Sequence, residues 1–137
     1  MSRPPTEDER ALWERAVAAR ERAYAPYSRF RVGAALLMQD GAVVTGGNIE
    51  NASFGMTICA ERSAVVRALA EGHSDFSAIA VAGNPDTPDV APCGACRQVL
   101  VEFCVATMPV IYVGGGELIT EALGELFPAA FALRAEP

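Results

Sequence analysis

Apolar residues recur at helical spacing in three stretches of the chain. In the first, Thr6 and Glu9 form the pattern of a capping box, and the helix is predicted to run to about Tyr24. Its apolar positions are Leu12, Trp13, Ala16, Val17 and Ala19. The same spacing predicts helices over Cys59–Glu71 and Cys93–Phe103.

Other stretches alternate between apolar and polar residues or form short apolar runs, and these predict strands. The predicted strands are Phe30–Met38, Ala42–Thr45, Phe76–Ala82, Val110–Val113 and Glu117–Thr120. Asp40 and Gly41 separate the first two as a hairpin turn, which makes this pair antiparallel. The helix between the third and fourth strands implies a right-handed parallel crossover, and a short helical turn is expected around Glu121–Leu126. Together the elements predict an α/β fold: a three-layer α/β/α sandwich, with a mixed five-stranded sheet and helices on both faces.

Length, composition and charge narrow the classes of function. With 137 residues, of which 51 % are hydrophobic, the chain is expected to form a single domain over residues 1–137. Its formal net charge of −6 offers no basic face to a phosphate backbone, so no nucleic-acid partner is expected. The N-terminal residues do not resemble a secretory signal, and no uncharged run reaches the roughly 20 residues that span a bilayer. We therefore expect a cytoplasmic protein with no membrane partner.

The cysteines are the strongest candidates for chemistry. Cys93 and Cys96 form a C-x-x-C pair, a spacing that in a reducing compartment more often binds metal or performs catalysis than forms a disulfide. Cys59 and Cys93 both lie at predicted helix starts, where unpaired N–H groups and the helix dipole stabilise thiolates. Two such helix starts converging on one ion would give a zinc site with three thiolates and an open position, as in catalytic zinc sites. Cys104 has no partner spacing and His73 follows a predicted helix end, so neither is expected to be a ligand.

Glu61, two residues after Cys59, turns the zinc hypothesis into an enzyme hypothesis, because a carboxylate beside a metal-bound water can move its proton. The motifs Cys59-Ala60-Glu61-Arg62 and Pro92-Cys93-Gly94-Ala95-Cys96-Arg97-Gln98 resemble those of the zinc-dependent cytidine deaminases, in their small, three-cysteine, homotetrameric branch. Further motifs agree in order and spacing, over Tyr24–Ala34, Gly46–Ser53 and Leu126–Phe131.

The resemblance implies hydrolytic deamination of cytidine and 2′-deoxycytidine to the uridines with release of ammonia, a step of pyrimidine salvage. It implies one Zn²⁺ per chain on the three cysteines, attack of zinc-bound hydroxide at C4 of the ring, and Glu61 as the proton shuttle. Arg62 is expected to hydrogen-bond to the cysteine sulfurs. The expected substrate-binding residues are Phe30, Asn48, Glu50, Ala60 and Phe131. Phe131 would act in the site of a neighbouring subunit, so the homotetramer would be part of the site.

Several alternatives remain open at this point. The nearest is a deaminase of a modified cytosine nucleoside such as blasticidin S. A polynucleotide cytosine deaminase is disfavoured by the negative charge, and a non-catalytic module with structural zinc is disfavoured by Glu61. Without the resemblance, Asn48 and Glu50 would be read as ordinary turn residues, and Phe30 and Phe131 as core residues. The chain also departs from many relatives, which have cysteine where Gly47 stands and leucine where Phe127 stands.

Overall fold

The computed structural model describes residues 1–133 and contains one mixed sheet of five strands in the order β2-β1-β3-β4-β5. The helices are α1 (Glu7–Ala19), α2 (Ala60–Ala70), α3 (Gly94–Phe103) and α4 (Leu123–Leu126), with 3₁₀ turns at Arg20–Arg22 and Phe54–Met56. The strands are β1 (Gly33–Met38), β2 (Val43–Gly47), β3 (Phe76–Ala82), β4 (Pro109–Gly114) and β5 (Glu117–Ala122). Within the described residues no helix is both long and apolar enough to cross a membrane.

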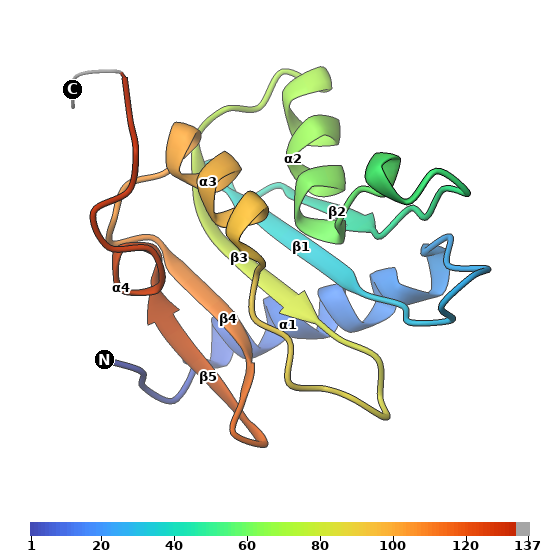
Figure 1. Ribbon diagram of the computed structural model, residues 1–137. Coiled ribbons are helices and arrows are strands. Elements are labelled where there is room, and N and C mark those ends of the chain that lie inside the picture. Colours follow the sequence, from blue (N-terminus) through green and yellow to red (C-terminus); the bar gives the residue numbers. More distant parts are fainter. Residues whose placement is uncertain (134–137) are drawn as a thin grey trace.

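The sheet is antiparallel except at its centre. β1 pairs antiparallel with β2 and β3, and β4 pairs antiparallel with β5, whereas β3 and β4 run parallel and are joined through α3. Helix α1 lies on one face of the sheet, and α2 and α3 lie on the other (Figure 1). The predicted three-layer sandwich, the hairpin and the parallel crossover are therefore confirmed.

The core divides into two layers because successive strand residues point to opposite faces. In β1, Ala34 and Leu36 pack toward α2 and α3, while Ala35 packs toward α1. In β3 the residues toward α1 are all alanines, which lets that helix lie close to the sheet. The layer around α2 and α3 contains most of the larger buried side chains, among them Ile79, Leu100 and Phe76.

Two glycines in adjacent strands let the helices touch the sheet backbone from opposite sides. A Cβ on Gly33 would lie 2.0 Å from the carbonyl oxygen of Ala16 in α1. A Cβ on Gly46 would lie 2.6 Å from the backbone nitrogen of Ala64 in α2. Both distances are well inside van der Waals contact, so neither position accepts a side chain while the helices stay in place. The depth of α2 against the sheet is thus fixed by backbone contact.

Two element boundaries differ from the sequence prediction by three residues or more, and the others by two at most. The first α-helix ends at Ala19 and continues to Arg22 only as a 3₁₀ turn. The first strand begins at Gly33 rather than Phe30, because the N–H groups before it donate to side chains and not to a neighbouring strand: Asn48 Oδ1 accepts from Val32 N at 2.9 Å and Ser28 Oγ from Phe30 N at 3.0 Å.

The N-terminal segment is tied to the outer edge of β5. The backbone of Arg3 exchanges two hydrogen bonds with that of Thr120, at 2.9 and 2.8 Å. The Arg3 guanidinium also binds both carboxylate oxygens of Glu9 at 2.8 and 2.9 Å. Glu9 forms the predicted capping box with Thr6 and accepts a further hydrogen bond from the Thr120 hydroxyl at 3.0 Å. One carboxylate therefore joins the first helix, the N-terminal segment and the edge strand.

Candidate active site

Three cysteine sulfurs converge where α2 and α3 begin. Cys59 Sγ lies 3.8 Å from Cys93 Sγ, and Cys93 Sγ lies 3.5 Å from Cys96 Sγ. All three sulfurs lie within 4.8 Å of one another, and this is the only such group of possible metal ligands among residues 1–133. Cys104 and His73 are not part of it. The predicted cysteine cluster is therefore assembled by the fold.

The helix starts explain how residues 34 positions apart meet. Cys59 is the N-cap of α2 and Cys93 the N-cap of α3, each with extended backbone. Their carbonyls accept the first helical hydrogen bonds, from Ser63 N at 3.0 Å and Arg97 N at 2.9 Å. Since both helices pack on the same face of the sheet, their positive ends meet at the sulfurs.

Hydrogen bonding within the cluster favours thiolate at Cys59. Its pKa is lowered to about 5, first by a hydrogen bond from the Cys96 thiol and then by the Arg62 guanidinium. The Arg62 Nη2 donates to Cys59 Sγ at 3.4 Å. The same hydrogen bond between Cys96 and Cys59, together with burial, raises the pKa of the Cys96 thiol, which is fully buried. A metal ion that binds thiolate ligands therefore suits this cysteine cluster.

Glu61 lies in the first turn of α2 and is buried, with 4 % of its surface exposed. Burial raises the pKa of its carboxyl to about 7, and the neighbouring Cys59 thiolate adds to this effect. The Cys96 thiol counteracts part of it by hydrogen bonding to the carboxylate. Glu61 is therefore buried beside the cysteine cluster, two residues after Cys59, in surroundings that suit proton transfer near neutral pH.

The donor set fits zinc. Three thiolates at about 2.3 Å from a tetrahedral Zn²⁺ lie roughly 3.8 Å from one another, which is close to the observed sulfur separations. Cys93 is exposed, Cys59 half-buried and Cys96 buried, so the cluster opens to solvent on one side. Three protein ligands with access for a fourth, non-protein ligand are the arrangement of catalytic zinc sites.

Short backbone pairings bring three sequence motifs beside the cysteines. Ile49 exchanges hydrogen bonds with Ile58 at 2.9 and 3.0 Å, one residue before Cys59. On its other side, Tyr24 N donates to Asn48 O and Glu50 N donates to Tyr24 O, each at 2.8 Å. The N-I-E segment thus lies between the tyrosine motif and the zinc motif.

The side chains of Asn48 and Glu50 both reach the segment that carries Phe30. Asn48 accepts from Val32 N and donates to Phe30 O at 2.8 Å, and it is 9 % exposed. Glu50 accepts from Tyr27 N at 2.9 Å, from Ser28 N at 3.1 Å and from the Ser28 hydroxyl. These hydrogen bonds lower the pKa of the Glu50 carboxyl, and the bond from the Ser28 hydroxyl has the largest effect. The sequence predicts substrate binding for these two residues but does not reveal their hydrogen bonds to this segment.

The other expected substrate-binding residues lie in different surroundings. Ala60 is fully buried in the first turn of α2, and Phe30 is half-buried against the larger core layer. Phe131 is 67 % exposed, and its carbonyl accepts a hydrogen bond from Gln98 Nε2 of α3 at 3.0 Å. Its side chain is thus presented outward while its backbone is anchored near the zinc motif.

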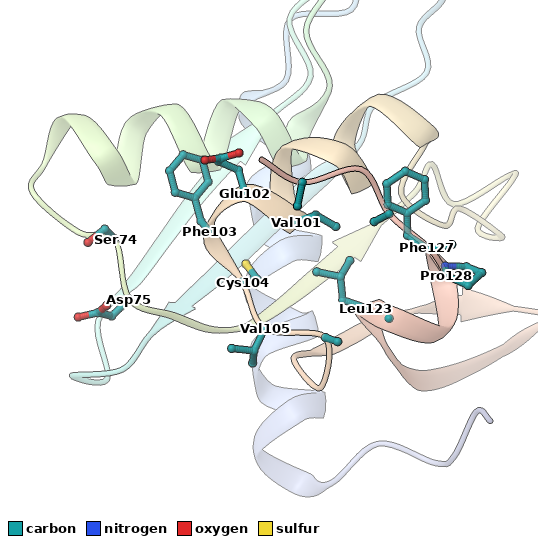
Figure 2. Close-up of a pocket in the computed structure, with 15 residues that line it drawn as sticks. Ser74, Asp75, Val101, Glu102, Phe103, Cys104, Val105, Leu123, Phe127 and Pro128 are labelled. Carbon is teal, nitrogen blue, oxygen red and sulfur yellow. The ribbon is translucent and has the colours of Figure 1, made fainter. Parts of the chain in front are cut away.

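A cavity lies at the other end of α3. It has a volume of about 680 Å³ and includes Phe103, Cys104, Leu123 and Phe127 in its lining (Figure 2). Burial raises the pKa of the Cys104 thiol to about 12, so this cysteine stays protonated. The cavity and the cysteine cluster are separate features.

A five-stranded α/β sandwich with a three-thiolate zinc site and a buried glutamate at paired helix starts defines a class: zinc-dependent hydrolases of the deaminase type. Comparison with known proteins agrees. Residues 6–112 match the sequence profile described as the cytidine and deoxycytidylate deaminase zinc-binding region. The chain belongs to this family.

Similar proteins match nearly the whole chain. A cytidine deaminase of Halalkalibacterium halodurans is 53 % identical over 126 residues, covering 90 % of this chain and 94 % of that protein. A cytidine deaminase of Mycobacterium tuberculosis is 42 % identical over 135 residues, covering 94 % and 93 %. The crystal structure of cytidine deaminase from Burkholderia pseudomallei superposes with a TM-score of 0.83 at 49 % identity, covering 93 % of this chain and all of that one.

Proposed function

We propose that the protein hydrolyses cytidine and 2′-deoxycytidine to uridine and 2′-deoxyuridine, with release of ammonia. The observation that carries this proposal is the burial of Glu61, whose carboxyl pKa is raised to about 7, beside the cluster of Cys59, Cys93 and Cys96. The similarity to named cytidine deaminases over about nine-tenths of the chain supports the substrate. The reaction serves pyrimidine salvage.

In the proposed mechanism, Cys59, Cys93 and Cys96 hold one Zn²⁺ per chain. When bound, the ion supplies Lewis-acid activation of water, lowering its pKa toward about 7. Glu61 removes a proton from the attacking water and delivers it to N3 of the ring. It then transfers the second water proton to the amine that leaves C4, so water adds its oxygen and ammonia departs.

Arg62 sustains this chemistry through the cysteines. Three thiolates outweigh the charge of Zn²⁺ and would weaken its power to activate water. The Arg62 guanidinium, with its hydrogen bond to Cys59 Sγ, withdraws charge from that sulfur, and the two helix N-termini act in the same direction.

The remaining expected residues bind the nucleoside. We assign the ribose hydroxyls to Asn48 and Glu50, which lie beside the zinc motif through the pairing of Ile49 with Ile58. Glu50 uses both carboxylate oxygens within the chain, so a sugar hydroxyl would share its acceptors with Ser28. In this proposal, Phe30 and Ala60 line the part of the site that holds the cytosine base.

Phe131 is assigned to the site of a neighbouring subunit. Its exposed ring and anchored backbone suit a residue that contacts another copy of the chain. We accordingly infer a homotetramer with sites at subunit interfaces. We also infer a single catalytic domain over residues 1–137, of which 134–137 lie outside the described residues, and a cytoplasmic location, where a reducing environment keeps the thiols free.

A direct assay tests the activity. Zinc-loaded protein is incubated with cytidine, and uridine and ammonia are measured as products, with Glu61→Gln as the control variant. Stoichiometric release of both products by the wild type alone is expected. A folded protein with one zinc per chain that releases no ammonia from either nucleoside would overturn the proposal. Faster turnover of blasticidin S than of cytidine would favour the alternative substrate.

A further inference from the structure

Arg97 follows the last cysteine of the cluster and joins two distant parts of the chain. Its Nε donates to the carbonyl of Pro92 at 2.6 Å, and its Nη1 donates to the carbonyl of Leu126 at 2.5 Å. Pro92 directly precedes the zinc-site residue Cys93 and is fully buried. Leu126 ends α4, where the chain turns into the C-terminal segment. One guanidinium therefore connects the loop before α3 to the start of that segment.

Gln98 makes a second attachment one residue later. Its side-chain nitrogen donates to the carbonyl of Phe131 at 3.0 Å. The segment between these two attachments, residues 126–131, runs alongside α3 (Figure 1). The start of α3 thus holds both its own cysteine loop and the backbone of the exposed phenylalanine.

The backbone between the two attachments is constrained. Ala129 has a φ of +53°, in the left-handed region that alanine rarely adopts. A non-glycine residue keeps such a conformation only where surrounding contacts enforce it. The bonds from Arg97 and Gln98 on either side of Ala129 supply that enforcement.

We propose that Arg97 is a positioning residue that couples the zinc loop to the C-terminal segment, so that the metal ligands and Phe131 are placed by the same side chain. The part concerning Phe131 rests on the proposed function, and the part concerning the zinc loop does not. Arginine suits this task because its planar fork donates in two directions at once, which a lysine ammonium on a flexible stem does not reproduce.

The test compares Arg97→Met, Arg97→Lys and Gln98→Ala with the wild type. The matched control is Arg67→Met, because Arg67 also donates to a backbone carbonyl, that of Thr45, but in α2 and away from the cysteines. Three quantities are measured: the rate at which a chelator removes zinc, amide hydrogen exchange over residues 123–131, and kcat and KM for cytidine.

For Arg97→Met we expect zinc release about 10-fold faster or more, the size of effect seen when partners of metal ligands are removed. We also expect faster exchange over residues 123–131 and a KM several-fold higher. Gln98→Ala should raise exchange near Phe131 and KM while zinc release stays unchanged. Arg97→Lys should fall between wild type and Arg97→Met, and Arg67→Met should match the wild type in all three.

If Arg97→Met released zinc and exchanged its amide hydrogens at the wild-type rates, the proposal would be overturned. Changes of equal size in Arg67→Met would also overturn it, because they would indicate general destabilisation. If Arg97→Met does not fold, Arg97→Lys and Gln98→Ala decide: the proposal then fails if exchange over residues 123–131 is unchanged in both. If the wild type binds zinc but deaminates no nucleoside, the proposed function fails, whereas zinc release and exchange still test Arg97.

Discussion

The Arg62 guanidinium donates a hydrogen bond to the sulfur of Cys59, three residues earlier on the same helix, at 3.4 Å. Both residues lie at the start of α2, so the contact is built into one helical turn. The sulfur that accepts this bond is also a ligand in the proposed zinc site, which makes the arginine a means of adjusting the metal without contacting it.

Replacing Arg62 with methionine should therefore weaken zinc binding. Removing a partner of a metal ligand typically costs about 10- to 100-fold in affinity or activity. The measurement is competitive titration with a zinc chelator, alongside kcat. Arg62→Lys, which keeps the charge, should lose less. Wild-type zinc affinity and turnover in Arg62→Met would contradict this role.

Glu61→Gln and Cys93→Ala should separate proton transfer from metal binding. Glu61→Gln removes the acid–base group but leaves the three thiols, so zinc content should remain at one per chain while kcat falls by about 10²- to 10⁴-fold or more. Cys93→Ala should lose both zinc and activity. Zinc per chain and kcat are measured for each variant. Loss of zinc in Glu61→Gln would show that the two roles are not separate.

Asn48→Ala should destabilise the protein as well as impair substrate binding. The substitution leaves Phe30 O and Val32 N without their side-chain partner in a buried setting, at a cost of about 1–3 kcal/mol. Urea unfolding of the zinc-loaded protein measures the loss, and KM for cytidine measures the effect on binding. An increase in KM with an unchanged free energy of unfolding would show that Asn48 serves the substrate alone.

Glu9 should stabilise the folded protein at neutral pH, and this contribution should disappear in acid. Hydrogen bonding to Arg3 is the main reason that its pKa falls from 4.5 to about 2, so the carboxylate is favoured in the folded state. Its contribution is fully present above pH 4.5 and is lost as the pH falls toward 2. Glu9→Gln should lower the free energy of unfolding by about 1–2 kcal/mol at pH 7. The difference from the wild type should shrink as the pH falls from 4.5 to about 2.

Urea unfolding at a series of pH values provides the measurement. Glutamine retains the hydrogen-bonding pattern of a capping box, so the variant isolates the charge. Glu14→Gln, an exposed position of α1, is the control and should leave the curve unchanged. A Glu9→Gln difference that is constant with pH would refute the linkage to the carboxylate.

Gly47→Ala should destabilise the fold. A Cβ here would lie 2.8 Å from Cα of Ala23, so the turn after α1 must shift. Overpacking of this kind costs typically about 1–3 kcal/mol. Gly55→Ala, where a Cβ meets nothing within 4 Å, is the matched control. Equal thermal stability of the two variants would indicate that the Ala23 turn adapts freely.

The sequence predicted the elements and the cysteine cluster well because both depend on local signals. A short apolar run located β3 at both ends, and the placement of Cys59 and Cys93 at helix starts led to the correct expectation of convergence. Gly115 and Gly116 form the turn between β4 and β5, with φ of +62° and +82°.

Contacts between distant segments were not predictable in this way. The pairing of Arg3 with Thr120, and the bonds from Arg97 to Leu126 and from Asn48 to Phe30, join residues whose separation no periodicity encodes. Arg97, Gln98 and Ser28 all lie within motifs of the family resemblance, which was the available signal, but a motif alone does not say which carbonyl a side chain reaches.

Gly33 and Gly46 have a consequence for protein engineering. Because α1 and α2 rest directly on the sheet backbone at these two positions, the thickness of the sandwich here cannot be tuned by side-chain size. Cys59 is the N-cap of α2, so any redesign that thickens this layer would translate one zinc ligand relative to the two at the start of α3. This spacing is a fixed dimension of the scaffold.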